Sequence, residues 1–164
     1  MPSQPDVLRL KSAPDLAREA IWFVVHSCLA LLLLAAVVLA ITLTHPSPGD
    51  VGPKQATTIL AFVVPALGGM LIARWQQNAA AGAVWIAGLL FLSFVCLWVL
   101  DLPTGKGMCQ GCSPAEKLYR TFFSIQHGSG LMGGDGLLVG SWVPLSLFGY
   151  ALGARFSLRQ AWPR

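Results

Sequence analysis

Four long apolar segments, separated by shorter polar ones, dominate the hydrophobic pattern of the chain. They cover residues 21–44, 57–73, 79–100 and 137–154. As an α-helix the first segment would be about 36 Å long, enough to cross a hydrocarbon core of about 30 Å. Single strands could not satisfy their backbone groups in lipid, so each segment is expected to be a helix. The pattern predicts an all-α, polytopic membrane protein built as a bundle of four transmembrane helices.

The same pattern divides the rest of the chain. The predicted parts are an N-terminal arm (1–20), a membrane domain (21–154) and a C-terminal tail (155–164). Within the membrane domain, residues 101–136 form a long polar loop between the third and fourth crossings. Pro65 and Pro144 interrupt the second and fourth crossings. Kinks are expected there, because proline removes a backbone donor and clashes with the preceding turn.

Two polar features mark the start of the first crossing. Ser12 and Asp15 have the spacing of a capping box, so a helix from about Ala13 is expected to run into the crossing. His26 lies near the start of the apolar segment, and ionisable residues inside membranes are candidates for function. The alternative is that its neutral imidazole reaches a headgroup or a backbone carbonyl.

Composition supports a bilayer environment. Apolar residues make up 55% of the chain and charged residues 11%, against about 25% charged in soluble domains. A soluble chain with so little charge could not cover its surface with polar groups, whereas lipid tails solvate apolar side chains. The net charge is +4, but Lys and Arg are scattered singly, without interleaved aromatic residues. We therefore expect the lipid bilayer, and no nucleic acid, as a partner.

The distribution of Lys and Arg predicts the orientation. Most of them fall on one side of the predicted crossings, namely Arg9, Lys11, Arg18, Arg74, Arg155, Arg159 and Arg164. The other side holds Lys54, Lys106, Lys117 and Arg120. The positive-inside rule places the first set, and with it both termini, in the cytoplasm. We expect a multi-pass protein of the inner (cytoplasmic) membrane, with the long loop outside.

Small residues recur at four-residue spacing in three of the crossings. Such residues let helices approach closely in lipid. The candidates for helix packing are Ala61, Gly69, Ala79, Ala83, Ala87, Gly149 and Gly153. They serve either the packing of this bundle or the docking of another membrane subunit, a different protein or a second copy of the chain. The sequence leaves both uses open.

The long loop contains a Cys-x-x-Cys pair, Cys109 and Cys112. A structural disulfide is one interpretation, and closing so short a loop stabilises by only about 2 kcal/mol. A redox-active pair is the second, because this is the spacing of thiol–disulfide exchange sites. A soft-metal site, such as one for Cu(I), is the third, with Met108, His127 and Met132 as further ligands.

An amphipathic helix is predicted directly after the cysteine pair. Ser113 suits the N-cap, Pro114 the first helical position, and Glu116 completes the capping box. The apolar residues of this helix are Leu118, Tyr119, Phe122, Phe123 and Ile125. The helix is expected either to lie flat at the membrane surface with its aromatic face toward the lipid or to pack onto the bundle as a lid.

The layout resembles that of the bacterial disulfide-forming quinone reductases. The shared features are four crossings, cytoplasmic termini, external cysteines and a flat helix in the second external loop. Those proteins carry cysteine pairs in both external loops, whereas residues 45–56 of this chain contain none. The main hypothesis is therefore a non-enzymatic accessory subunit of a larger membrane assembly. The alternatives are a quinone-linked thiol–disulfide oxidoreductase and a soft-metal handling protein. The sequence identifies no cofactor, and a bound lipid or quinone is compatible with it.

Overall fold

The structure is a computed structural model that describes residues 13–44, 51–102, 111–124 and 139–161. Every regular element in these ranges is helical. The elements are α1 (Ala13–Thr44), α2 (Val51–Trp75), the 3₁₀ helix η1 (Ala79–Ala83), α3 (Trp85–Asp101), α4 (Pro114–Phe122) and α5 (Val139–Ala161). α1 is described from Ala13 and α2 from Val51, earlier than the predicted residue 57. Ser12, and with it the predicted capping box, lies outside the described residues.

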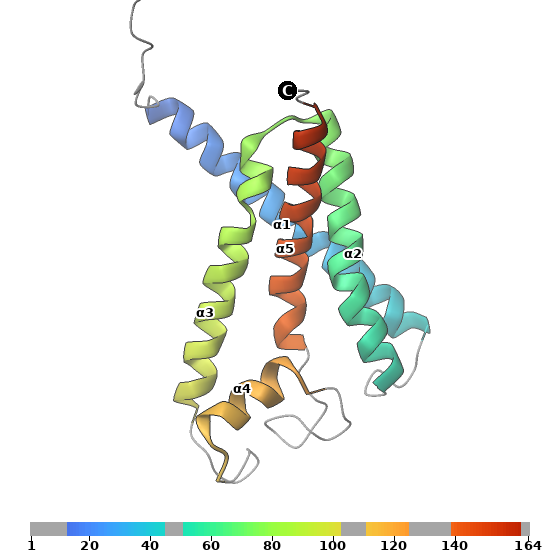
Figure 1. Cartoon of the computed structure of the whole chain (residues 1–164), viewed down its shortest axis with the longest axis vertical. Coiled ribbons are helices and arrows are strands. Elements are labelled where there is room, and N and C mark those ends of the chain that lie inside the picture. The colour runs from blue at the N-terminus through green and yellow to red at the C-terminus, as the bar shows by residue number, and fades with distance from the viewer. Residues whose placement is uncertain (1–12, 45–50, 103–110, 125–138, 162–164) are drawn as a thin grey trace, which may run out of the picture.

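The helices form a bundle with α5 at its centre. Figure 1 shows α5 between α2 and α3, while α1 crosses the others obliquely and contacts α2, η1 and α5. The start of α1 and the end of α5 lie at the same end of the bundle. α4 lies crosswise at the opposite end, against α3 and α5.

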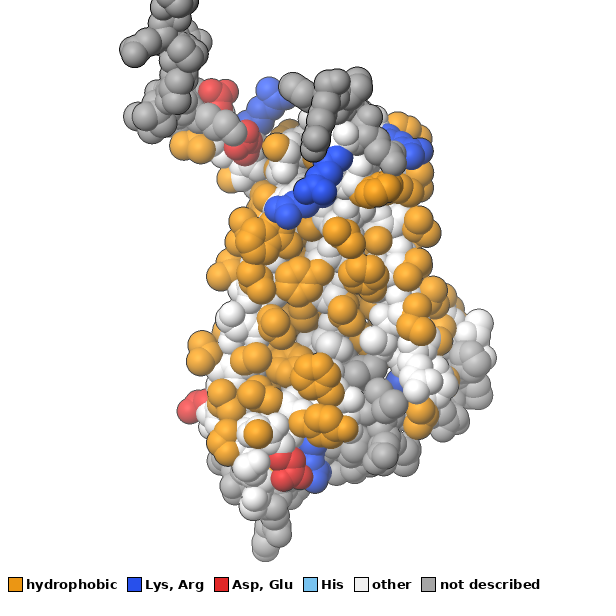
Figure 2. Space-filling model, viewed as in Figure 1, with side chains coloured by type: hydrophobic (Ala, Val, Ile, Leu, Met, Phe, Trp, Pro, Cys, Tyr) orange, Lys and Arg blue, Asp and Glu red, His pale blue; other side chains and the backbone are white. Residues whose placement is uncertain are grey.

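Three stretches of helix are long and apolar enough to cross a membrane. They are Pro14–Thr44, Val51–Trp75 and Ala79–Asp101. Large apolar side chains such as Leu32 and Leu90 are exposed along them. In Figure 2 apolar side chains cover the middle of the visible face, and charged side chains lie toward its two ends. Lipid tails solvate such a surface and water does not, so the chain is a membrane protein.

α5 is not among these three stretches. It is less apolar, because it carries Arg155 and Arg159 together with several glycine and serine residues. Residues 137 and 138, where the predicted fourth crossing starts, lie outside the described residues. The fourth crossing therefore stays a prediction at this point.

The predicted third crossing consists of two kinds of helix. Before α3 begins, η1 is capped by Asn78, whose side-chain oxygen accepts from the Ala80 amide at 2.9 Å. A 3₁₀ helix has three residues per turn, so a four-residue spacing that starts in η1 does not follow one face. Ala79 is exposed, and Ala83 and Ala87 are only half-buried. The buried residues of this region are Ala80, Ala81, Gly82, Val84 and Gly88.

Close contact between backbones joins α2 to α5. Three glycines have no room for a Cβ, because it would overlap a carbonyl oxygen of the facing helix. The pairs are Gly149 with Phe62, Gly153 with Ala66, and Gly69 with Tyr150. In the first two pairs the residue numbers rise together, so α2 and α5 run in the same direction. Ala61, Pro65, Gly69 and Ala73, spaced four residues apart, are all buried on α2.

Gly153→Ala should destabilise the bundle by about 1–3 kcal/mol, because the added methyl group meets backbone that cannot move aside cheaply. Gly52→Ala is the matched control. Nothing lies within 4 Å of its Cβ position, and alanine is the better helix former. Thermal unfolding in one detergent, followed by circular dichroism, compares the two variants. Unfolding of Gly153→Ala at the wild-type temperature would contradict the contact.

Candidate functional site

α4 is fixed to the end of the bundle by its inner face. Phe122 is buried and packs with Val95 and Val99 of α3. Leu118, one turn earlier, packs against the same cluster. Gly140 of α5 leaves room for Thr121, whose methyl group would lie 3.0 Å from a Cβ at that position. α4 therefore packs against the ends of α3 and α5.

A lysine joins α4 to the end of α3. The Nζ atom of Lys117 donates to the carbonyl oxygens of Leu102 at 2.6 Å and Leu100 at 3.4 Å. The last carbonyls of a helix lack partners within the helix, and a positive charge near them is favourable. α3 has no basic residue of its own in its last turn. Lys117 supplies that charge from the neighbouring helix.

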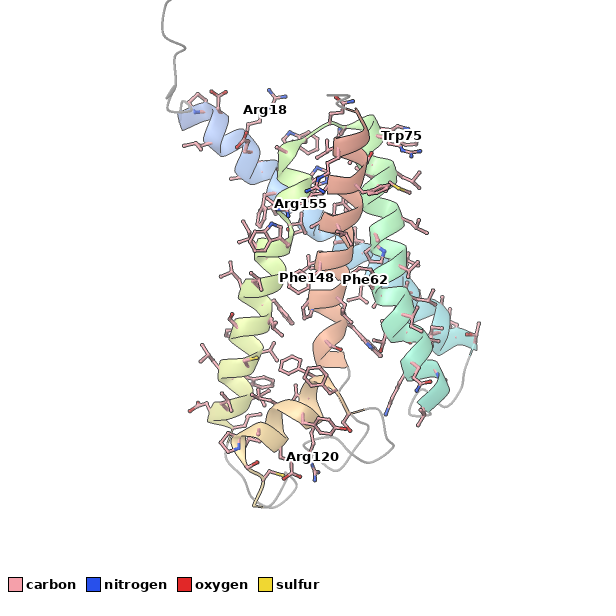
Figure 3. The ribbon with its side chains drawn as sticks, viewed as in Figure 1. Arg18, Phe62, Trp75, Arg120, Phe148 and Arg155 are labelled. Carbon is pink, nitrogen blue, oxygen red and sulfur yellow. The ribbon has the colours of Figure 1, made fainter. Side chains whose placement is uncertain are left out.

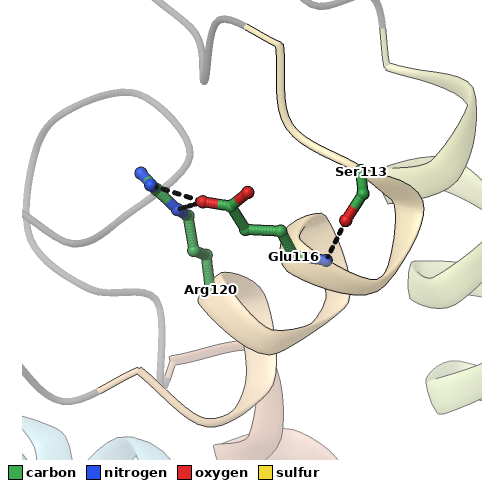
Figure 4. A network of polar contacts seen from close by, with 3 residues as sticks. All are labelled: Ser113, Glu116 and Arg120. Atoms are coloured by element: carbon green, nitrogen blue, oxygen red, sulfur yellow. Dashed lines mark hydrogen bonds and ion pairs between the residues drawn. The ribbon is translucent and has the colours of Figure 1, made fainter.

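The start of α4 shows the Ser113 half of the predicted capping box, while the Glu116 side chain pairs with Arg120. The Ser113 hydroxyl accepts from the Glu116 amide at 3.3 Å, and Pro114 occupies the first turn. The Glu116 carboxylate then accepts from Arg120 at 2.7 Å and 3.0 Å (Figure 4). The cap and the ion pair hold a helix of only nine residues in one conformation.

Two exposed aromatic residues, Tyr119 on α4 and Phe123 at its C-cap, form what we call the outer face of α4. Tyr119 is 60% exposed and Phe123 is 68% exposed. Their rings stack with centroids 6.4 Å apart. Leu118 and Phe122 pack inward, and Phe123, although mostly exposed, also lines an apolar groove beside them. Ile125, the fifth apolar residue predicted for this helix, lies outside the described residues.

α4 also closes one end of an apolar groove between α3 and α5. The groove has a volume of about 340 Å³. Its lining residues are Leu92, Cys96, Leu118, Phe122, Phe123, Ser141, Pro144, Leu145 and Phe148. A groove of this size and character can hold part of a hydrophobic ligand.

Cys112 is half-buried and directly precedes the N-cap of α4. It packs against the same apolar cluster as Phe122. Cys109, Met108, His127 and Met132 lie outside the described residues, so the disulfide, redox and metal interpretations stay predictions. Within the described part of the chain, no three His, Cys, Asp or Glu residues form a metal-binding group.

His26 contacts Tyr150, a partner that the sequence does not predict. Its Nδ1 atom lies 2.7 Å from the Tyr150 hydroxyl, and both side chains are fully buried. The other ring nitrogen, Nε2, has no partner among the described residues. The pair connects α1 to α5 across 124 positions of sequence, and local spacing carries no signal for such a contact.

Comparisons with protein-family models, with curated proteins and with solved structures find no match to this chain.

Lys117→Gln should loosen α4, because a hydrogen bond from a charged group to an otherwise unpaired carbonyl contributes about 1.5–3 kcal/mol. We expect amide hydrogen exchange in α4 to accelerate at least about tenfold. Arg120→Gln is the control on the same helix. It removes only the pair with Glu116, for which about 0.3–0.5 kcal/mol is typical. Equal exchange rates in the two variants would contradict the capping role of Lys117.

Proposed function

We propose that α5 is a fourth membrane crossing. The support is its parallel backbone contact with α2, which is itself long and apolar enough to span a membrane. A helix in such contact lies at the same depth as its neighbour. With four crossings, the start of α1 and the end of α5 share one side, and the Lys and Arg distribution makes that side the cytoplasm. α4 then lies at the external surface of the inner membrane.

The proposed function is that of a non-enzymatic subunit of a membrane assembly, with the outer face of α4 as its contact for a membrane protein partner. The observation that carries this proposal is the exposed, stacked pair Tyr119 and Phe123 on a helix fixed from its other side by Lys117 and Phe122. Aromatic residues and arginine are enriched at protein interfaces. Because α4 is already held in place by these contacts, binding a partner costs less conformational entropy.

The polar contacts between helices are consistent with a structural role. The Trp142 indole donates to the Thr58 hydroxyl at 2.9 Å and joins α5 to α2. The His26–Tyr150 pair joins α1 to α5. Each of these buried or half-buried groups holds two helices together. Among the described residues, the exposed side chains Tyr119 and Phe123 form no such link between helices and are available to a partner.

Co-purification in mild detergent tests the proposal. The double variant Tyr119→Ala/Phe123→Ala should lower the recovery of a stoichiometric partner at least about tenfold, the order expected for interface hot spots. The matched control is Phe94→Ala/Trp98→Ala on α3, a second exposed aromatic pair four residues apart. It should retain the partner. Equal retention by both double variants, or the absence of any stoichiometric partner, would overturn the proposal.

A thiol–disulfide oxidoreductase is the second candidate, favoured by the position of Cys112. The N-terminal end of a helix stabilises a thiolate, and the apolar groove between α3 and α5 lies against the same cluster. In this reaction a partner dithiol is oxidised to a disulfide. The Cys109–Cys112 disulfide is reduced to two thiols, and a quinone then takes up the two electrons and two protons.

The variant Cys109→Ser/Cys112→Ser separates the two candidates. For a non-enzymatic subunit, partner recovery persists with a loss of stability of only about 2 kcal/mol. For an oxidoreductase, the oxidising activity disappears together with the mixed disulfide to the partner.

A further inference from the structure

Arg155 lies where α5, η1 and α3 meet. Figure 3 shows it nearer than Phe148 and Phe62 to the end of the bundle where α5 terminates. Arg18 and Trp75 lie still closer to that end. In the proposed topology this is the level between the acyl chains and the cytoplasmic headgroups.

The guanidinium of Arg155 is held by two contacts with neighbouring elements. Its Nε atom donates to the Gly82 carbonyl oxygen at 2.8 Å. The group also lies over the Trp85 ring, 5.6 Å from the ring centre, within the range of a cation–π interaction. These two contacts occupy the Nε edge and one face of the guanidinium. Among the described residues, the two Nη groups have no protein partner.

An apolar groove continues from Arg155 along the bundle. It has a volume of about 320 Å³ and is lined by Phe62, Trp85, Phe148, Ala151, Leu152 and Arg155. Three helices contribute to it, so its walls are fixed by the packing of the bundle. The positively charged guanidinium of Arg155 thus lies at one end of an apolar groove.

The charge of Arg155 is not balanced within the described part of the protein. No carboxylate there lies within ion-pair distance of it. Arg159 lies one turn further along α5, is exposed, and adds a second positive charge near the same face. Charged groups near hydrocarbon are costly unless they are paired, so the site favours an anion.

We propose that Arg155 and this groove bind one anionic phospholipid of the cytoplasmic leaflet. The two Nη groups donate to oxygens of the lipid phosphate, a geometry that suits the guanidinium. An acyl chain then lies against Phe148, Leu152 and Phe62. The inference rests on the four-crossing arrangement proposed above but not on a protein partner. Loss of lipid binding would leave the co-purification result at α4 unchanged.

Native mass spectrometry of the purified, delipidated full-length chain tests this site. The probes are phosphatidylglycerol, phosphatidylcholine with the same acyl chains, and inorganic phosphate. The wild-type chain should hold one phosphatidylglycerol at least about tenfold more tightly than phosphatidylcholine. Arg155→Gln should abolish that preference. Arg74→Gln, which removes an exposed arginine at the same end of the bundle, should keep it.

A second variant tests the site if Arg155→Gln fails to fold. Leu152 is 58% exposed at the groove, and Leu152→Trp should fill the groove and weaken phosphatidylglycerol binding while Arg155 stays intact. Equal binding of the two lipids, or equal losses in Arg155→Gln and Arg74→Gln, would overturn the proposal. Competition by millimolar inorganic phosphate would also overturn it, because the site would then recognise the anion alone.

Discussion

Backbone contact between α2 and α5 determines how the rest of this protein is arranged. In a bilayer the apolar faces of helices gain little by leaving lipid for one another, so association depends on close packing and polar links. Gly149, Gly153 and Gly69 let each helix meet a carbonyl oxygen of the other directly. Such spacing also permits weak Cα–H to carbonyl contacts. Because the contact is between backbones, it fixes both the distance and the register of the two helices.

A few polar groups add to the apolar packing that holds the remaining elements in the bundle. α1 is joined to α5 by the His26–Tyr150 pair. η1 is joined to α5 by the bond from Arg155 to the Gly82 carbonyl, and α4 to α3 by Lys117. Each link satisfies a group that would be costly to leave unpaired in or near hydrocarbon. These contacts position the two surfaces that we propose for binding, the outer face of α4 for a protein partner and the groove at Arg155 for a lipid.

Much of the fold was predictable because it depends on local chemistry. The apolar segments predict the helices, and the Ser113, Pro114 and Glu116 pattern predicts the start of α4. The 3₁₀ helix η1 was not predicted, because an alanine-rich run is apolar in either helical form. It shifts the packing surface from Ala79 and Ala83 to Ala80, Ala81 and Gly82.

The candidate sites were less accessible from the sequence. The amphipathic pattern places Tyr119 and Phe123 beside Leu118 and Phe122, but only the position of α3 decides how deeply each of these side chains is buried. The same holds for Tyr150 and Gly82, whose partners lie far away in the chain. Spacing identifies residues able to make such contacts, and the register between helices decides which of them do.

Sidedness labelling tests the central claim, that α5 crosses the membrane in the same direction as α2. Single cysteines at Val51, Gln76, Ala115 and Arg159, all exposed positions, are introduced into a chain whose native cysteines are replaced. A membrane-impermeant maleimide should reach Val51→Cys and Ala115→Cys from the external side of the intact membrane. It should reach Gln76→Cys and Arg159→Cys only after the membrane is opened. Labelling of the Gln76 and Arg159 positions from opposite sides would contradict the account.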